Sequence, residues 1–165
     1  MKLFKTFIFQ NLTEEEFEDM NRLRFLRTAS YEKNTPIFQT GDTVHEIGIV
    51  LCGCVHIESI DLWGNKSILS HVPEGHAFAE TYVLCHEPML VDAIASKDSE
   101  IAFVNTDILL SGQHHEKTWY FKMMNNLLHI LAQKNLVLSN RIFCTSAKTI
   151  RERLFTYFSN LSVKN

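Results

Sequence analysis

Cysteine residues are the first side chains in this sequence that could do chemistry, because thiolates bind metals, form disulfides and act as nucleophiles. The chain has four of them, namely Cys52, Cys54, Cys85 and Cys144. The spacing in Cys52-Gly53-Cys54 is shorter than the usual zinc pattern, and no second pair accompanies it. The sequence therefore predicts free thiols, with a thiol switch through Cys85 or Cys144 as an open alternative.

Histidine residues are the next candidates, since the chain contains eight and imidazole is a common metal ligand. His71 and His76 flank Pro73 and Gly75 rather than forming a regular ligand motif. No Ser/His/Asp set and no pair of carboxylates stands out either. The sequence therefore predicts no metal site, no cofactor and no enzymatic activity.

Composition and charge indicate an ordinary globular protein of 165 residues with a net charge of −3. This charge argues against nucleic-acid binding by this portion of the protein, since such domains usually carry a basic face. The start of the chain turns acidic before an apolar core develops, unlike a signal peptide, and no run approaches the roughly 18 apolar residues of a membrane span. We therefore expect a cytoplasmic protein with no membrane partner.

A β region with regularly spaced glycines is the first of the elements that must position any site. Gly41, Gly53, Gly64 and Gly75 recur every 11 or 12 residues, with short β-branched and aromatic runs between them, which is typical of a sandwich or barrel. The clearest hairpin tip is Trp63-Gly64-Asn65. The predicted strands are 28–32, 36–38, 46–51, 54–62, 66–72, 90–95 and 100–105.

Helices are predicted on both sides of this β region. Thr13 and Glu16 have the spacing of a capping box, so a helix begins there, and we expect it to end near Arg27. Residues 79–84 interrupt the β pattern with a short helix, and such an interruption usually serves a site. Asp107 suits the first turn of another helix, and residues 148–161 form an amphipathic one.

The longest predicted helix covers residues 114–145, which contain neither Gly nor Pro. Its apolar residues occupy the a and d positions of a heptad, with Asn135 at one a position, as in parallel two-stranded coiled coils. We therefore predict a homodimer. Its predicted interface comprises Phe121, Met124, Leu128, Leu131, Asn135, Leu138 and Ile142.

The order of these elements resembles the Crp/Fnr superfamily of bacterial transcription regulators. The resembling segments are 37–42, 49–55, 63–69, 73–75, 78–80, 98–100 and 149–154. The resemblance implies a mainly β fold with α: a double-stranded β-helix (a jelly-roll or cupin-like β roll) flanked by short helices and followed by the dimerisation helix. It also implies three parts, namely an effector-sensing domain (1–113), the dimerisation helix (114–145) and the start of a DNA-binding domain (146–165), whose helix-turn-helix lies beyond this chain and binds DNA.

The resemblance also implies where a cyclic nucleotide would bind, and here the sequence departs from the family. Nucleotide-binding members read Phe-Gly-Glu and then Pro-Arg-Ser-Ala, where the arginine pairs with the phosphate and the glutamate with the ribose. This chain keeps Glu80 but has Ala79 for the glycine, Met89 for the arginine and Leu90 for the serine. We therefore predict that cAMP and cGMP do not bind at useful affinity.

An apolar pocket with a few polar groups suits a small organic effector instead. The predicted effector-pocket residues are Phe78, Glu80, Thr81, Tyr82, Met89, Leu90, Leu127, Lys134 and Val137. Three alternatives stay open: a pocket filled by its own side chains in a thiol-sensing regulator, a haem sensor, and a cupin-like metal-dependent enzyme, since cupin barrels resemble this β roll. An iron–sulfur sensor is disfavoured because no cysteine precedes Cys52.

Overall fold

The structure is a computed structural model that describes residues 6–146 and 149–163. The chain forms two compact units, Met1–Asn126 and Leu127–Asn165. The first unit holds every strand of the described chain together with helices α1 to α3 and the first turns of α4. The second unit holds the remainder of α4 and helix α5.

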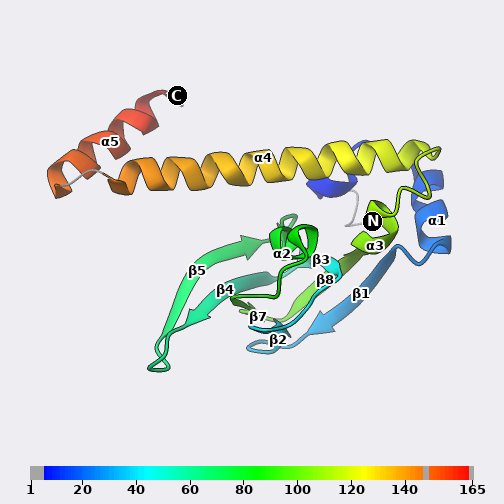
Figure 1. Ribbon diagram of the computed structural model, residues 1–165, viewed down its shortest axis with the longest axis horizontal. Coiled ribbons are helices and arrows are strands. Elements are labelled where there is room, and N and C mark those ends of the chain that lie inside the picture. Colours follow the sequence, from blue (N-terminus) through cyan, green and yellow to red (C-terminus); the bar gives the residue numbers. More distant parts are fainter. Residues whose placement is uncertain (1–5, 147–148, 164–165) are drawn as a thin grey trace. The chain divides into compact units, whose positions relative to one another are not determined.

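Two four-stranded antiparallel sheets make up the β roll of the first unit (Figure 1). One sheet has the order β1-β8-β3-β6 and the other the order β2-β7-β4-β5. This arrangement confirms the predicted fold class of a β roll with flanking helices. The strands are β1 (Leu26–Tyr31), β2 (Pro36–Phe38), β3 (Glu46–Cys52), β4 (Cys54–Ile60), β5 (Lys66–Pro73), β6 (Ala77–Phe78), β7 (Asp92–Ala95) and β8 (Ser99–Asn105).

Strands β3 and β8 form the centre of the core. Both contain runs of consecutive buried residues, so both faces of this part of the sheet are covered. Their β-branched side chains fit a pleated surface that is buried on both sides. Strand β5 is the opposite case, because it is an edge strand and Val72 is its one buried residue.

Helix α1 (Glu14–Arg22) begins with the predicted capping box. The Glu16 backbone N–H donates to the Thr13 hydroxyl, and the Thr13 N–H donates to the Glu16 carboxylate. The prediction that this helix extends to near Arg27 is wrong. Arg24 has a φ of 53°, which ends the helical path, and β1 starts at Leu26 because it pairs there with Val104 of β8.

Strand boundaries also differ from the prediction in detail. Strand β7 begins at Asp92 rather than at residue 90, and β4 ends at Ile60 rather than at residue 62. Strand β6 was not predicted, because two residues carry no periodicity. It forms where Phe78 pairs with Gly48 of β3.

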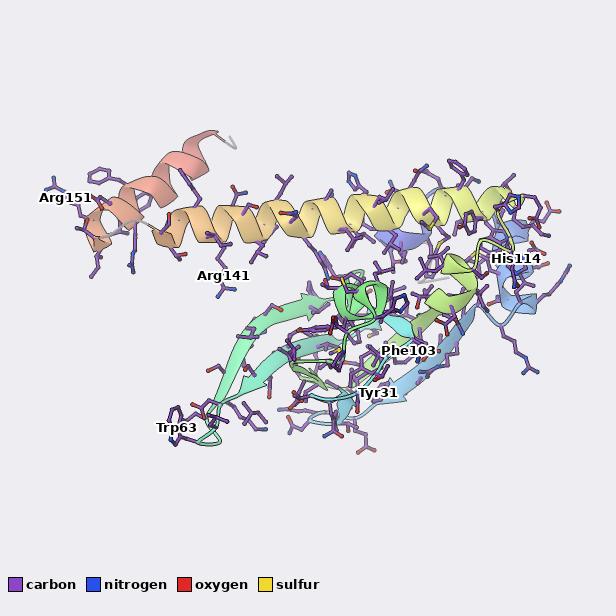
Figure 2. All side chains as sticks on the ribbon, viewed as in Figure 1. Tyr31, Trp63, Phe103, His114, Arg141 and Arg151 are labelled. Atoms are coloured by element: carbon purple, nitrogen blue, oxygen red, sulfur yellow. The ribbon has the colours of Figure 1, made fainter. Side chains whose placement is uncertain are left out.

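The predicted hairpin tip is confirmed between β4 and β5. Gly64 has a φ of 84°, and the Asp61 carboxylate accepts hydrogen bonds from the Trp63 and Asn65 N–H groups at 2.9 and 2.8 Å. A hydrogen bond from the Asn65 side chain, with these backbone bonds, lowers the pKa of Asp61. Trp63 itself projects from this tip (Figure 2) and is exposed.

Four further helices follow the predicted pattern with small shifts. Helix α2 (Glu80–Cys85) is the predicted interruption of the β region, and α3 (Thr106–Leu110) has Asn105 as its N-cap. Helix α4 (Thr118–Ser146) begins four residues later than predicted, because turns occupy the residues after Gly112. Helix α5 (Ile150–Val163) follows, and residue 148 of its predicted range lies outside the described residues. None of the helices in the described ranges is long and apolar enough to cross a membrane.

Candidate functional site

The turn from β6 into α2 forms the centre of the predicted effector site. Ala79 joins the two elements in a left-handed conformation, with φ of 66° and ψ of −2°. This turn sends the chain from the roll directly into the helix, so that Phe78 and Glu80 on either side of Ala79 are both buried. Glu80 is only 4% exposed, and its carboxylate accepts a hydrogen bond from the Thr81 hydroxyl at 3.3 Å.

Met89 lies in the segment that follows α2, and its side chain is 1% exposed. Its backbone is fixed from both sides: the Met89 N–H donates to the Asp42 carbonyl at 2.9 Å, and the Gly41 N–H donates to the Met89 carbonyl at 2.8 Å. The neighbouring Leu90 is 71% exposed. An apolar side chain therefore points inward at this position, and the next one points into solvent.

The remaining predicted pocket residues are divided between the two units. Thr81 is exposed and Tyr82 is half-buried on α2, in the first unit. Leu127, Lys134 and Val137 lie on α4 in the second unit. The assignment of these residues to one effector pocket stays a prediction.

Two surface hollows lie elsewhere on the first unit. One, of about 500 Å³, is lined by α1 residues and by Lys117, Thr118 and Trp119. The other, of about 670 Å³, is lined by residues of β1, by Cys52 and by Asp98, Ser99 and Glu100. Neither hollow includes Glu80 or Met89, so neither coincides with the predicted site.

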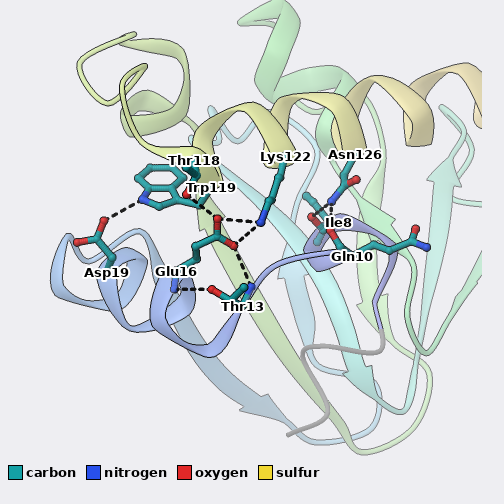
Figure 3. Close-up of polar contacts among 9 residues, drawn as sticks. All are labelled: Ile8, Gln10, Thr13, Glu16, Asp19, Thr118, Trp119, Lys122 and Asn126. Atoms are coloured by element: carbon teal, nitrogen blue, oxygen red, sulfur yellow. Dashed lines mark hydrogen bonds and ion pairs between the residues drawn. The ribbon is translucent and has the colours of Figure 1, made fainter.

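A polar cluster joins α1 to the first turns of α4, all within the first unit (Figure 3). Lys122 donates to both carboxylate oxygens of Glu16 at 2.9 and 2.8 Å, and the Thr118 hydroxyl donates to the same carboxylate at 2.6 Å. Burial of Glu16 raises its pKa, but the hydrogen bonds from Lys122, Thr118 and Thr13 outweigh this and lower it from 4.5 to about 2.

Two more contacts strengthen this attachment. The buried Trp119 indole N–H donates to Asp19 at 3.0 Å, and the Asn126 amide donates to the carbonyls of Ile8 and Gln10 at 2.9 and 2.8 Å. These pairs could not be predicted from the sequence, because their members lie about a hundred positions apart and follow no local pattern. Together they fix where the long helix begins relative to α1.

The predicted dimer interface maps onto an exposed stripe of α4. Phe121, Leu128, Leu138 and Ile142 are between 57% and 69% exposed. Met124 and Leu131 of the same stripe are half-buried, and Asn135 is exposed. A row of exposed apolar side chains at heptad spacing suits a helical partner, and the dimer itself stays a prediction.

Metal ligation is possible at one group of side chains in the part of the chain that the structure describes. Cys54, His56 and His71 have ligand atoms that all lie within 4.8 Å of one another. This group was not predicted from the sequence, because two of its members lie on one strand and the third lies on the next.

Comparison with known proteins identifies the family of the roll. A sequence profile of the cyclic nucleotide-binding domain matches residues 28–112, which is more than half of the chain. The chain belongs to the cyclic nucleotide-binding domain family. None of the curated proteins compared with this domain matches it.

Solved structures share the fold of this cyclic nucleotide-binding domain. A cyclic nucleotide-binding domain from Methylobacillus flagellatus has a TM-score of 0.72 at 16% identity, over 90% of this chain and 83% of that one. The sensor domain of the transcriptional regulator DNR from Pseudomonas aeruginosa has a TM-score of 0.59 at 18% identity, over 90% and 93% of the two chains. The predicted resemblance to Crp/Fnr-type regulators is thereby confirmed at the level of the fold.

The catabolite activator protein of Thermus thermophilus is a further structure of this kind, with a TM-score of 0.64 at 24% identity. The match covers 84% of this chain but 64% of the Thermus chain. The present cyclic nucleotide-binding domain therefore spans less than two thirds of that regulator.

Proposed function

We propose that this chain is the sensor and dimerisation part of a Crp/Fnr-type transcription regulator that does not respond to cAMP or cGMP. Its roll senses a small organic effector, and α4 relays the signal to a DNA-binding domain that follows the chain. The protein acts as a homodimer in the cytoplasm and has no enzymatic activity. The family membership of the roll and its likeness in fold to solved regulators support this proposal.

The observation that carries the proposal is the burial of Met89 at the position where nucleotide-binding members have arginine. Its side chain is 1% exposed and offers no charge to a phosphate. A hydrogen bond to a charged group contributes roughly 1.5–3 kcal/mol, and without the arginine its positive charge no longer offsets the repulsion between the anion and the buried carboxylate of Glu80, which binding members also have. Both effects weaken binding of a cyclic phosphate.

The α2 turn supports the same conclusion. In nucleotide-binding members the glycine before the glutamate leaves backbone N–H groups open to the phosphate. Here Ala79 occupies that position and is itself buried. Its methyl group takes up space beside the backbone that a phosphate would approach.

Titration calorimetry tests this proposal directly. We expect no binding of cAMP or cGMP at micromolar concentration to the chain as it stands, and micromolar binding of either would contradict the proposal. The variant Ala79→Gly/Met89→Arg/Leu90→Ser restores the residues of nucleotide-binding members and should gain affinity. Leu90→Ser alone is the matched control, since Leu90 is exposed, and should gain none.

Native mass spectrometry of the purified chain tests the effector and the assembly. A dimer that carries a discrete extra mass would support an organic effector and give its class. A bare dimer would favour the alternative of a filled pocket, which the burial of both Phe78 and Met89 already supports. A monomer would contradict the proposed role of α4.

A further inference from the structure

Three potential metal ligands lie together on one face of the β4–β5 hairpin. Cys54 and His56 are two positions apart on β4, so their side chains point to the same face of the sheet. His71 of β5 pairs directly with His56 across the antiparallel ladder. Residues paired in this way have Cβ atoms about 4.5–5.5 Å apart, and a diagonal neighbour such as Cys54 is still within reach.

The side chains converge as this register requires. The ligand atoms of Cys54, His56 and His71 all lie within 4.8 Å of one another. The two imidazole rings are nearly perpendicular, with centroids 4.4 Å apart and an interplanar angle of 87°. Two ligands of one tetrahedral zinc ion are roughly 3.3–3.7 Å apart, given Zn–N and Zn–S bonds of about 2.0–2.3 Å. Small side-chain rotations are therefore enough to bring all three onto one ion.

The surroundings of the three ligands favour metal binding. The Nδ1 atom of His56 lies 3.9 Å from a carboxylate oxygen of Glu58, and both side chains are partly buried. At this separation the two groups make no hydrogen bond, but the negative charge of the carboxylate favours a cation beside it. The Cys54 backbone is held as well, because its N–H donates to the Ser99 hydroxyl at 3.2 Å and its carbonyl accepts from the Ser96 N–H at 2.9 Å.

We propose that Cys54, His56 and His71 bind a zinc ion on the β4–β5 hairpin, with the fourth coordination position open to solvent. One thiolate and two imidazoles form a ligand set of the kind that zinc accepts with a water in the fourth position. His71 is exposed, so an ion can enter from solvent, whereas Cys54 and His56 are half-buried. The site shares no residue with the turn at Glu80 and does not depend on the proposed effector.

Cobalt(II) titration of the full chain, reduced and freed of metal, tests the site because cobalt replaces zinc and reports its ligands. We expect one cobalt per chain, with a thiolate-to-cobalt charge-transfer absorption that zinc abolishes by displacement. Cys54→Ser should remove this absorption, whereas Cys85→Ser, which changes an exposed thiol outside the site, should retain it. Absence of cobalt and zinc binding, or retention of the absorption in Cys54→Ser, would overturn the proposal.

Zinc affinity of two histidine variants provides a second test. His71→Ala should weaken zinc binding at least about tenfold, since even loss of an outer partner of a metal ligand costs 10–100-fold. His76→Ala, at another exposed histidine of the same unit, should leave the affinity unchanged. Both sites are exposed, so both variants should fold, which circular dichroism verifies. Equal zinc affinity of the two variants would rule out His71 as a ligand.

Discussion

Ala79 adopts a backbone conformation that glycine occupies more easily. Its φ of 66° lies in the left-handed region, where a Cβ atom costs roughly 1–2 kcal/mol. The surrounding structure maintains it, because β6 before it is paired to β3 and Glu80 after it begins a helix. The strain therefore lies at the turn that shapes the candidate site.

Replacement of Ala79 by glycine tests this strain. Relief of the strain should offset the lost methyl group and the greater freedom of the unfolded chain, so we expect Ala79→Gly to change the free energy of unfolding by less than about 0.5 kcal/mol. Ala77→Gly, at a buried position of β6 without such strain, should lower it by about 1–2 kcal/mol. Urea denaturation measures both, and equal losses would contradict the argument.

Glu16 should make stability depend on pH. Its pKa is lowered from 4.5 to about 2 in the folded chain, so its contribution is fully present above about pH 5 and is lost as pH falls toward 2. Glu16→Gln should lower the free energy of unfolding by about 1–3 kcal/mol at pH 7. The difference from wild type should shrink progressively between pH 5 and pH 2.5 in thermal denaturation.

Glu15→Gln is the matched control for this experiment, because Glu15 is the exposed neighbour of Glu16 on α1. We expect its stability to follow that of the wild type across the same pH range. A Glu16→Gln variant whose difference from wild type stays constant down to pH 2.5 would show that the ion pair with Lys122 does not set the pH dependence.

At the scale of elements, β3 and β6 approach closely enough for the Phe78 ring to lie directly against Gly48. A Cβ atom at Gly48 would overlap the Phe78 ring, which is fully buried. Gly48 is therefore required for its small size, not for a special φ value. The glycines at the turns between strands serve a different purpose, since Gly41, Gly64 and Gly75 all have positive φ.

Gly48→Ala should consequently destabilise the roll. We expect the free energy of unfolding to fall by about 1–3 kcal/mol, as for other overpacked cores. The double variant Gly48→Ala/Phe78→Leu should lose less than the sum of its two single variants, because the shorter side chain makes room for the methyl group. Strict additivity in chemical denaturation would indicate that the two residues do not collide.

At the scale of the whole molecule, the exposed stripe on α4 supports the proposed self-association. Exposed apolar side chains at a and d positions lose contact with water when two such helices pair. The predicted division at residues 113 and 145 stays a proposal. The chain itself divides into compact units at Asn126, within α4.

Asn135 should restrict this assembly to a dimer. On α4, the Ser139 hydroxyl donates to the side-chain oxygen of Asn135 at 3.2 Å. A polar residue that becomes buried at one a position of a coiled coil lowers its stability but restricts the assembly to two helices. We expect Asn135→Leu to strengthen association and to yield species larger than dimers in sedimentation velocity. Gln133→Leu, two residues earlier and outside the a and d positions, should leave the dimer unchanged. If the Asn135→Leu variant stays strictly dimeric and its dimer affinity is unchanged, Asn135 does not belong to the dimer interface.

Local patterns in the sequence determined the element types of this protein. The capping box at Thr13 and Glu16, the hairpin at Gly64 and the helical interruption after Ala79 all depend on residues a few positions apart. Backbone preferences and periodicity act over this range, which explains why the β region and the long helix could be predicted, whereas the β roll itself was implied by the family resemblance. The predicted ends of the helices and strands were less accurate, because pairing with a strand distant in sequence decides where an element ends.

Tertiary structure alone decided which distant side chains meet. The ion pair of Glu16 with Lys122 joins elements at opposite ends of the first unit's sequence. The grouping of Cys54, His56 and His71 depends on the register of one hairpin, since a shift by one residue would place His71 on the other face. Likewise, Met89 is buried and Leu90 exposed although both are apolar neighbours. Burial and cross-strand register arise from the packing of the whole chain, so no local pattern contains them.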